Sequence, residues 1–199
     1  MSVRIYVEGG GGDKDTLKRC SEGFSRYCQK LVPANRNPRI VPCGGRDQAF
    51  KRFKTAVELS QAGDVCALLV DAEAPVRSAS SFQHLQERDR WSFPALGWHK
   101  VFLMVQAMEA WFLADRAALA VFYDGGFLAN SLPGNPKDIE VIRKDALEPA
   151  LLHSSKPTKT KGEYHKVKHG FALLALIDPA KVAEASPHAK LFNEFLAGL

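Results

Sequence analysis

The chain has 199 residues, of which 46% are hydrophobic and 25% charged, and its formal net charge is +5. This composition is that of an ordinary folded protein and excludes a wholly disordered or membrane class. No apolar run approaches the roughly 20 residues that span a bilayer, and the first residues lack the apolar segment of a signal peptide, so we expect a cytoplasmic protein with no membrane partner. The four cysteines show no metal-binding spacing, and we expect them to be free, buried thiols: Cys20, Cys28, Cys43 and Cys66.

The first part of the chain alternates apolar runs with helical patterns. Four runs predict strands, at residues 3–7, 39–43, 65–70 and 101–105. Apolar side chains at helical spacing follow three of them, at residues 14–31, 47–59 and 106–115. Strands that are apolar throughout and separated by helices indicate a parallel sheet with helices on both faces. We therefore predict a Rossmann-type α/β domain over residues 1–125.

From residue 126 onward the sequence loses its strand pattern. Helical patterns around residues 138–152, 169–177 and 187–196 predict a helical C-terminal extension, residues 126–199, packed on the same domain. Asp178-Pro179 and Ser186-Pro187 mark breaks between its later helices. Residues 74–97, between the third and fourth strands, predict a loop and a short helix beside the site.

Acidic residues follow the predicted strands at their carboxyl ends. Glu8 comes directly after the first strand, and Asp71 and Glu73 come after the third. Because parallel strands end at the same edge of a sheet, where ligands of such folds bind, these side chains are expected to converge. In an extended segment, Asp71 and Glu73 would point to the same side. Since Mg²⁺ and Mn²⁺ prefer oxygen ligands, the sequence predicts a divalent-metal site at these three residues, with Glu109 after the fourth strand as a further catalytic candidate.

Four glycines, residues 9–12, follow Glu8 but match neither common nucleotide-binding motif. A P-loop ends in Gly-Lys-Ser/Thr, whereas Gly12 is followed by Asp13-Lys14. Glu8 would also repel a phosphate unless a metal ion lay between them. Between two acidic strand ends, the glycines favour a functional loop over a plain turn.

The densest basic stretch, residues 156–169, has two open interpretations. Its lysines, with Tyr164, His165 and His169 among them, are typical both of a solvated loop and of a phosphate-binding surface. On the second interpretation, the residues that contact substrate phosphates are Arg46, Lys161, Lys166, Lys168 and His169.

His99 and Trp111 are expected to have mainly structural roles, whereas base stacking stays open for Trp91 and Trp98. His99 precedes the fourth strand, at the edge opposite the expected site. Trp91, Trp98 and Trp111 are residues of a type that stacks on bases, but helical spacing favours core packing for Trp111.

Several segments together resemble a known family. They are Tyr6-Val7-Glu8-Gly9, Val41-Pro42-Cys43-Gly44-Gly45-Arg46, Leu69-Val70-Asp71-Ala72-Glu73-Ala74-Pro75-Val76, Met108-Glu109-Ala110-Trp111-Phe112 and Gly162-x-Tyr164-x-Lys166-x-x-His169. They are similar to a bacterial family of domains of unknown function that is grouped with Toprim-like (topoisomerase–primase) folds and related to OLD-type nucleases. Glu73 departs from the aspartate usual in the Toprim pattern.

The resemblance implies hydrolysis of nucleic-acid phosphodiesters with Mg²⁺ or Mn²⁺. Glu8 would match the general acid/base or metal ligand, and Asp71 and Glu73 would match the metal-holding pair. It also implies an ABC- or OLD-type ATPase partner in bacterial defence against phage and other mobile elements. Two alternatives stay open: a non-catalytic module that binds nucleic acid or an ATPase through a degenerate Toprim site, and metal-dependent phosphoryl transfer on a small substrate. DNA versus RNA and the oligomeric state, a homo-oligomer included, also stay open.

Overall fold

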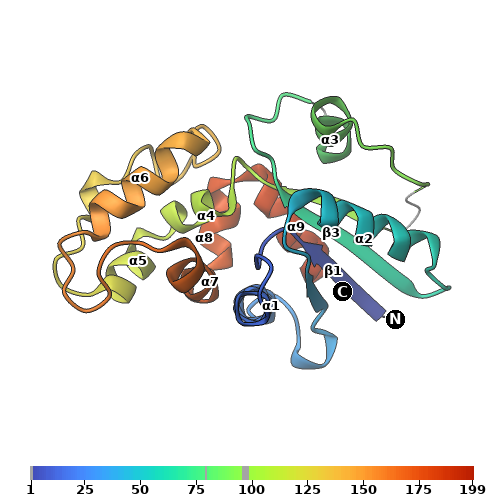
Figure 1. The fold of residues 1–199 in the computed structure, drawn as a ribbon, viewed down its shortest axis with the longest axis horizontal. Coiled ribbons are helices and arrows are strands. Elements are labelled where there is room, and N and C mark those ends of the chain that lie inside the picture. Colours follow the sequence, from blue (N-terminus) through green and yellow to red (C-terminus); the bar gives the residue numbers. More distant parts are fainter. Residues whose placement is uncertain (1, 79, 96–98) are drawn as a thin grey trace.

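The computed structural model describes residues 2–78, 80–95 and 99–199 and has an α/β fold built on one parallel sheet (Figure 1). Its strands are β1 (Ser2–Val7), β2 (Arg39–Pro42), β3 (Asp64–Asp71) and β4 (Lys100–Met104). They lie in the order β2-β1-β3-β4, and every neighbouring pair is parallel. The α/β class and the four predicted strands are confirmed, with boundaries shifted by one residue.

Nine α-helices occur in the described residues. They are α1 (Lys14–Gln29), α2 (Arg46–Glu58), α3 (Ser81–Asp89), α4 (Met108–Ala114), α5 (Arg116–Tyr123), α6 (Lys144–Ser155), α7 (Lys166–Leu176), α8 (Pro179–Ala185) and α9 (Pro187–Ala197). Two short 3₁₀ helices, η1 (Ala34–Arg36) and η2 (Ala129–Ser131), complete the set. None of the helices in the described part of the chain is both long and apolar enough to cross a membrane.

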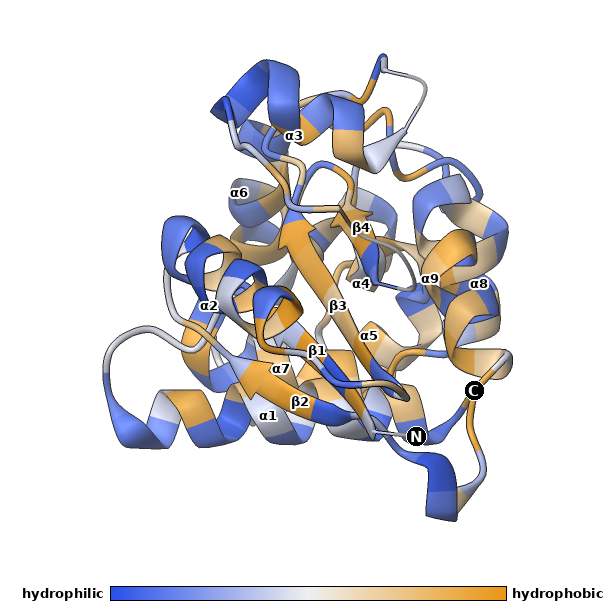
Figure 2. Ribbon diagram, turned by 90° about the vertical axis from the view of Figure 1, so that its right-hand side faces the viewer, coloured by the Kyte–Doolittle hydropathy of each residue, from blue (hydrophilic) through white to orange (hydrophobic). Residues whose placement is uncertain are grey.

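The sheet is covered on both faces, as predicted from its apolar strands. Alternate strand residues point to opposite faces, so Ile5 and Leu69 join one core and Tyr6 and Leu68 the other. Figure 1 shows α1 on one side of the sheet and α2 and α3 on the other, and Figure 2 shows the strands coloured as hydrophobic. Burial on both faces accounts for strands that read as continuous apolar runs.

The C-terminal helices complete the core rather than forming one of their own. Phe192 of α9 packs edge-on against Phe102 of β4, with ring centroids 5.3 Å apart, and lies 6.2 Å from Trp111 of α4. A single cluster of buried residues therefore runs from Ile5 to Leu196, across residue 125. Helices α4 to α7 lie on the side of the molecule toward which the strands point, at the left in Figure 1.

The segment before α6 corrects one sequence prediction. A helix was expected from residue 138, but α6 begins at Lys144. Asn135 and Asp138 form a tight turn, and the N–H of Ile139 donates to the carbonyl of Ala185 in α8 (3.2 Å). Ile139 is buried, as a residue on the inner face of a helix would be, but it lies outside α6. Its N–H bonds to α8 instead of to a carbonyl within a helix.

Helices α5 and α8 were not predicted, although both carry standard start signals. Asp115 ends α4 and caps α5 by accepting from the N–H of Ala118 (3.3 Å). Asp178 caps α8, and Pro179 occupies the first helical position, where proline is favoured. Asp178-Pro179 is thus a helix start as well as a break.

The expectations for the cysteines, His99 and Trp111 are confirmed. All four cysteines are free and buried. The His99 Nδ1 atom accepts from the N–H of Cys66 (2.9 Å) and its ring also contacts Ser60, so His99 ties the start of β4 to β3. Trp111 is fully buried and stacks on Tyr27, whereas Trp98 lies outside the described residues.

Gly23 sets the close packing of α1 on α7, and we expect Gly23→Ala to destabilise the protein. A Cβ atom at this position would lie 2.6 Å from the carbonyl oxygen of Phe171 in α7. The helices must therefore separate, which should lower the free energy of unfolding by about 1–3 kcal/mol in urea denaturation.

The control for this prediction is Gly170→Ala, on the facing helix. A Cβ atom there would have its nearest neighbour at 3.4 Å, an ordinary contact. Since alanine favours a helix over glycine by about 1 kcal/mol, Gly170→Ala should be neutral or stabilising. Equal stability of the natural protein and Gly23→Ala would contradict the close approach of the two helices.

Candidate metal site

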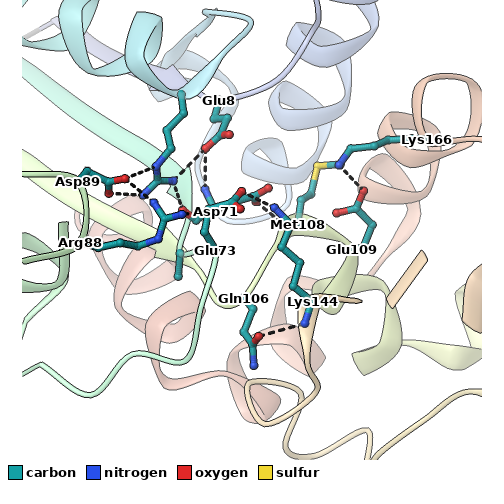
Figure 3. A network of polar contacts seen from close by, with 12 residues as sticks. Glu8, Asp71, Glu73, Arg88, Asp89, Gln106, Met108, Glu109, Lys144 and Lys166 are labelled. Atoms are coloured by element: carbon teal, nitrogen blue, oxygen red, sulfur yellow. Dashed lines mark hydrogen bonds and ion pairs between the residues drawn. The ribbon is translucent and has the colours of Figure 1, made fainter. Parts of the chain in front are cut away.

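Three carboxylates converge at the carboxyl edge of the sheet. Glu8 follows β1, Asp71 ends β3 and Glu73 lies two residues beyond, and each offers an oxygen within 4.8 Å of the others (Figure 3). The parallel register, which aligns Val7 with Leu69, brings the ends of β1 and β3 side by side. The structure therefore brings together the three residues that the sequence predicted as metal ligands.

Glu8 is held between the backbone of β3 and a guanidinium group. Its Oε2 atom accepts from the N–H of Asp71 (3.1 Å) and lies 3.3 Å from Nη1 of Arg46. Burial raises the pKa of the Glu8 carboxyl, and the positive charge of Arg46 offsets this only in part. These contacts fix the position of the Glu8 carboxyl group, while burial makes it easier to protonate than an exposed glutamate.

Asp71 is the most deeply buried of the three, with 7% of its surface exposed. Its Oδ1 atom accepts from the N–H of Met108 (2.8 Å), so it also caps the first turn of α4. Burial, together with the negative charges of Glu8 and Glu109, raises the pKa of Asp71 to about 8 against the opposing charge of Lys166. Without a cation, burial and these neighbouring negative charges therefore favour the protonated form of Asp71.

Glu73 reaches the site by a route that the sequence did not predict. Its backbone is not extended but left-handed, with φ of 66°, a conformation that costs a non-glycine residue about 1 kcal/mol or more. The N–H of Glu73 donates to the carbonyl of Gln106 (2.8 Å), which holds this turn. The convergence with Asp71 was predicted correctly, but the reason, two alternate residues of one extended strand, was wrong.

Lys144 is the main partner of the Glu73 carboxylate. Its ammonium group is paired with Oε1, and Arg88 of α3 lies 4.0 Å from Oε2. The N–H of Lys144 donates to the side chain of Gln106 (3.0 Å), so the start of α6 is fixed beside the site. Lys144 could not be predicted as a site residue, because its position depends on the irregular path of residues 126–143.

Arg46, at the start of α2, is held from several sides. Asp89 of α3 binds its guanidinium through two contacts of 3.1 and 2.7 Å, and Glu8 and the carbonyl of Asp71 also contact it. The guanidinium carbon lies 5.0 Å from the centre of the Trp91 ring. Burial alone would lower the pKa of Arg46, but these carboxylates outweigh it and keep the group charged.

Glu109 and Lys166 form a second charged pair behind the three carboxylates. The Lys166 Nζ atom lies 2.9 Å from Oε1 of Glu109, and the hydroxyl of Tyr164 donates to the same oxygen (3.4 Å). Glu109 is only 3% exposed, and its charge outweighs burial to raise the pKa of Lys166. Glu109 is not among the three close carboxylates, so it lies beside the candidate metal site and is not one of the candidate metal ligands.

The charges of the site balance only if one carboxyl group is neutral. The described residues contribute five carboxyl groups and four cations: Glu8, Asp71, Glu73, Asp89 and Glu109 against Arg46, Arg88, Lys144 and Lys166. A proton on Asp71 makes the two sets equal, whereas a divalent cation that displaced this proton would leave the site with one positive charge in excess.

A cavity of about 310 Å³ opens between the carboxylates and α7. Glu8, Asp71, Glu109 and Lys166 line its polar part, and Phe171 is among its apolar lining. The glycine loop forms another wall. Gly9 and Gly44 exchange two backbone hydrogen bonds of 2.8 Å, which joins the ends of β1 and β2.

Gly44 itself is required by the geometry of this wall. It has φ of 73°, and a Cβ atom would lie 2.8 Å from the carbonyl oxygen of Gly11. The glycines therefore have a defined structural role beside the carboxylates.

The other predicted phosphate-binding residues lie away from this cavity. Lys161 is over the ring of Phe122 at 5.0 Å, and Lys168 lines a separate groove between α1 and α7. His169 is buried, and its Nδ1 atom accepts from the N–H of His165 (3.2 Å) and contacts the hydroxyl of Tyr123 (3.1 Å). Of the predicted set, the structure brings Arg46 and Lys166 to the carboxylates.

Arg88, Asp89, Lys144 and Gln106 were missed as site residues. The first two belong to a charged segment whose position beside the site was expected, but charge alone does not indicate a partner. Neither Lys144 nor Gln106 belongs to a recognisable motif.

The parallel sheet and its acidic edge define an α/β protein with a candidate divalent-metal site. Residues 7–199 match the family described as Domain of unknown function (DUF4276). The chain belongs to this family. No curated protein and no solved structure matches the chain.

The raised pKa of Asp71 predicts how stability depends on pH. The folded state keeps a proton on Asp71 up to about pH 8, whereas an unfolded aspartate loses it near pH 4. Without metal, stability should therefore fall as pH rises through this window, with this group contributing up to about 1.4 kcal/mol per pH unit. Asp71→Asn should flatten that slope, because an amide keeps the bond from Met108 and carries no proton to lose.

Urea unfolding from pH 5 to pH 8 in the presence of a chelator measures this effect. Asp138→Asn, at an exposed position on the turn before α6, is the control and should keep the natural slope. Identical slopes for the natural protein and Asp71→Asn would show that Asp71 is already ionised in the folded state.

Proposed function

We propose that the protein is a Mg²⁺- or Mn²⁺-dependent nuclease that hydrolyses phosphodiester bonds of nucleic acid. The observation that carries this proposal is the convergence of Glu8, Asp71 and Glu73 within 4.8 Å at the carboxyl edge of a parallel sheet. Hard divalent cations are bound by such oxygen sets and, once bound, activate water and neutralise the charge of a reacting phosphate.

The residues around the carboxylates fit this chemistry. Glu8, Asp71 and Glu73 would hold the metal ion, and Glu8 would also accept a proton from the attacking water. Lys166 and Arg46 supply positive charge on two sides of the carboxylates, where phosphate oxygens of a bound substrate would lie. Glu109 would orient Lys166 through their 2.9 Å contact.

The resemblance of the strand-end motifs to the Toprim pattern supports the same proposal. In the Toprim pattern, the acidic residue after the first strand corresponds to Glu8, and the pair that holds the metal ion corresponds to Asp71 and Glu73. By the same resemblance, the protein would act as the effector of an ABC- or OLD-type ATPase in bacterial defence. Co-purification with such an ATPase would test this part separately from the chemistry.

Glu8→Gln should remove the activity while preserving the fold. The amide can still accept from the N–H of Asp71, but it cannot take a proton and binds metal weakly. Cleavage of labelled DNA and RNA in Mn²⁺ should fall by at least ~100-fold, the lower range for loss of one general acid/base. Glu184→Gln, at an exposed position on α8, is the matched control. Full cleavage by folded Glu8→Gln would exclude the proposed site.

One observation favours a second candidate, a non-catalytic binding module with a degenerate site. The Lys144 ammonium group already neutralises Glu73, as a metal ion would. On this alternative, lysine replaces the metal permanently. On the proposed function, the two cations compete for the carboxylate.

Lys144→Met distinguishes the two candidates. A cation near the metal position opposes metal binding, so its removal should tighten Mn²⁺ binding by at least ~10-fold in calorimetry at pH 7. The natural protein should also release about one proton per bound ion below pH 8, because Asp71 must ionise. If neither protein binds Mn²⁺, the non-catalytic module is the correct function.

A further inference from the structure

A second charged feature lies on the face of the sheet that α2 covers. Here a groove of about 500 Å³ runs between α2 and the edge strand β2. Its floor includes Tyr6 and Val41, and four cationic side chains line it: Arg4, Arg39, Lys51 and Arg52. None of the three close carboxylates contributes to it.

The regular geometry of the strands and the helix assembles these cations. Arg4 of β1 lies beside Arg39 of β2 in the parallel register, so the two side chains emerge next to each other on the same face of the sheet. Lys51 and Arg52 lie on the opposite wall, while Phe53 of α2 points into the core. Because β2 is an edge strand and α2 packs mainly over β3 and β1, this strip of the sheet stays uncovered.

The charge of the groove is largely unbalanced within the protein. Arg4 pairs with Asp64 at 3.1 Å. In the part of the chain that the structure describes, Arg39, Lys51 and Arg52 have no ion-pair partner, and the lining includes no acidic residue. The Arg52 Nη1 atom donates to the carbonyl of Pro42 (3.0 Å), which fixes its guanidinium at the rim. A groove lined by four cationic side chains and no carboxylate favours an anionic partner.

We propose that this groove binds the sugar–phosphate backbone of a nucleic acid and directs it to the carboxylates. The class of partner rests on the proposed function. Among the described residues that line the groove, Tyr6 is the one aromatic side chain, and it is only 7% exposed. It offers little surface for base stacking, so contacts to phosphates are expected instead.

The length and direction of the groove suit an extended polymer. It follows α2 from Gln48 to Leu59, about 16 Å at 1.5 Å per residue. Two residues before Gln48, Arg46 contacts Glu8 at the carboxylates. A backbone lying along α2 would therefore lead to the candidate metal site.

The proposal can be tested by measuring how the binding of a labelled DNA duplex depends on salt. Fluorescence anisotropy in the presence of a chelator measures this binding without hydrolysis. Arg39→Gln/Lys51→Gln removes two groove cations whose side chains make no hydrogen bond to the described residues 2–78, 80–95 and 99–199. Lys137→Gln/Lys190→Gln removes two exposed cations elsewhere and gives the same net charge. The groove variant should lower the slope of log affinity against log salt by about 1.8, and weaken binding at least ~10-fold at about 0.1 M salt. The control should keep the natural slope.

The outcomes separate this inference from the proposed chemistry. Equal slopes for the groove and control variants would overturn the proposal. Binding of polyglutamate but not DNA or RNA, lost in the groove variant, would also overturn it, because the occupant would then be an acidic protein. Groove-dependent DNA binding without any hydrolysis in Mn²⁺ would support the groove and contradict only the nuclease.

Discussion

The negative charge of Glu8, Asp71 and Glu73 has to be balanced where β1 and β3 end, because carboxylates this close repel one another. The chain balances it with side chains from separate helices. Arg46 comes from α2, Lys144 from α6 and Lys166 from α7, and a proton on Asp71 completes the balance. The negative charge of three residues thus favours the positions that α2, α6 and α7 take around the edge of the sheet.

This arrangement joins the helical region to the chemistry. Lys144 and Lys166 both lie beyond residue 125, yet their charged groups meet acidic residues of the first 125. Lys144 contacts a predicted metal ligand, and Lys166 reaches the site through Glu109. The helices after the sheet therefore complete the site as well as the hydrophobic core.

Much of the sheet and part of the site could be predicted because both depend on local patterns. Apolar runs indicated the four strands, and their carboxyl ends indicated Glu8, Asp71 and Glu109. The pairing of Glu109 with Lys166 could not be predicted, since it joins residues 57 positions apart through the packing of α7. Lys144 was missed for a related reason: the expected helix does not form at residues 138–143, where the N–H of Ile139 donates to the carbonyl of Ala185 in α8 instead. Where tertiary hydrogen bonds replace local ones, periodicity no longer indicates position.

The core shared by the first strand and the last helix also determines the order in which the protein can fold during synthesis. Ile5 leaves the ribosome well before Phe192, yet both belong to one cluster. Until α9 has been made, Phe102 and Trp111 lack their contacts with Phe192, so the nascent chain exposes apolar surface that the finished protein buries. Lys144 and Lys166 likewise join the carboxylates late. A partly synthesised chain thus has the acidic residues with Arg46 and Arg88 but without the two lysines that complete the set of cations.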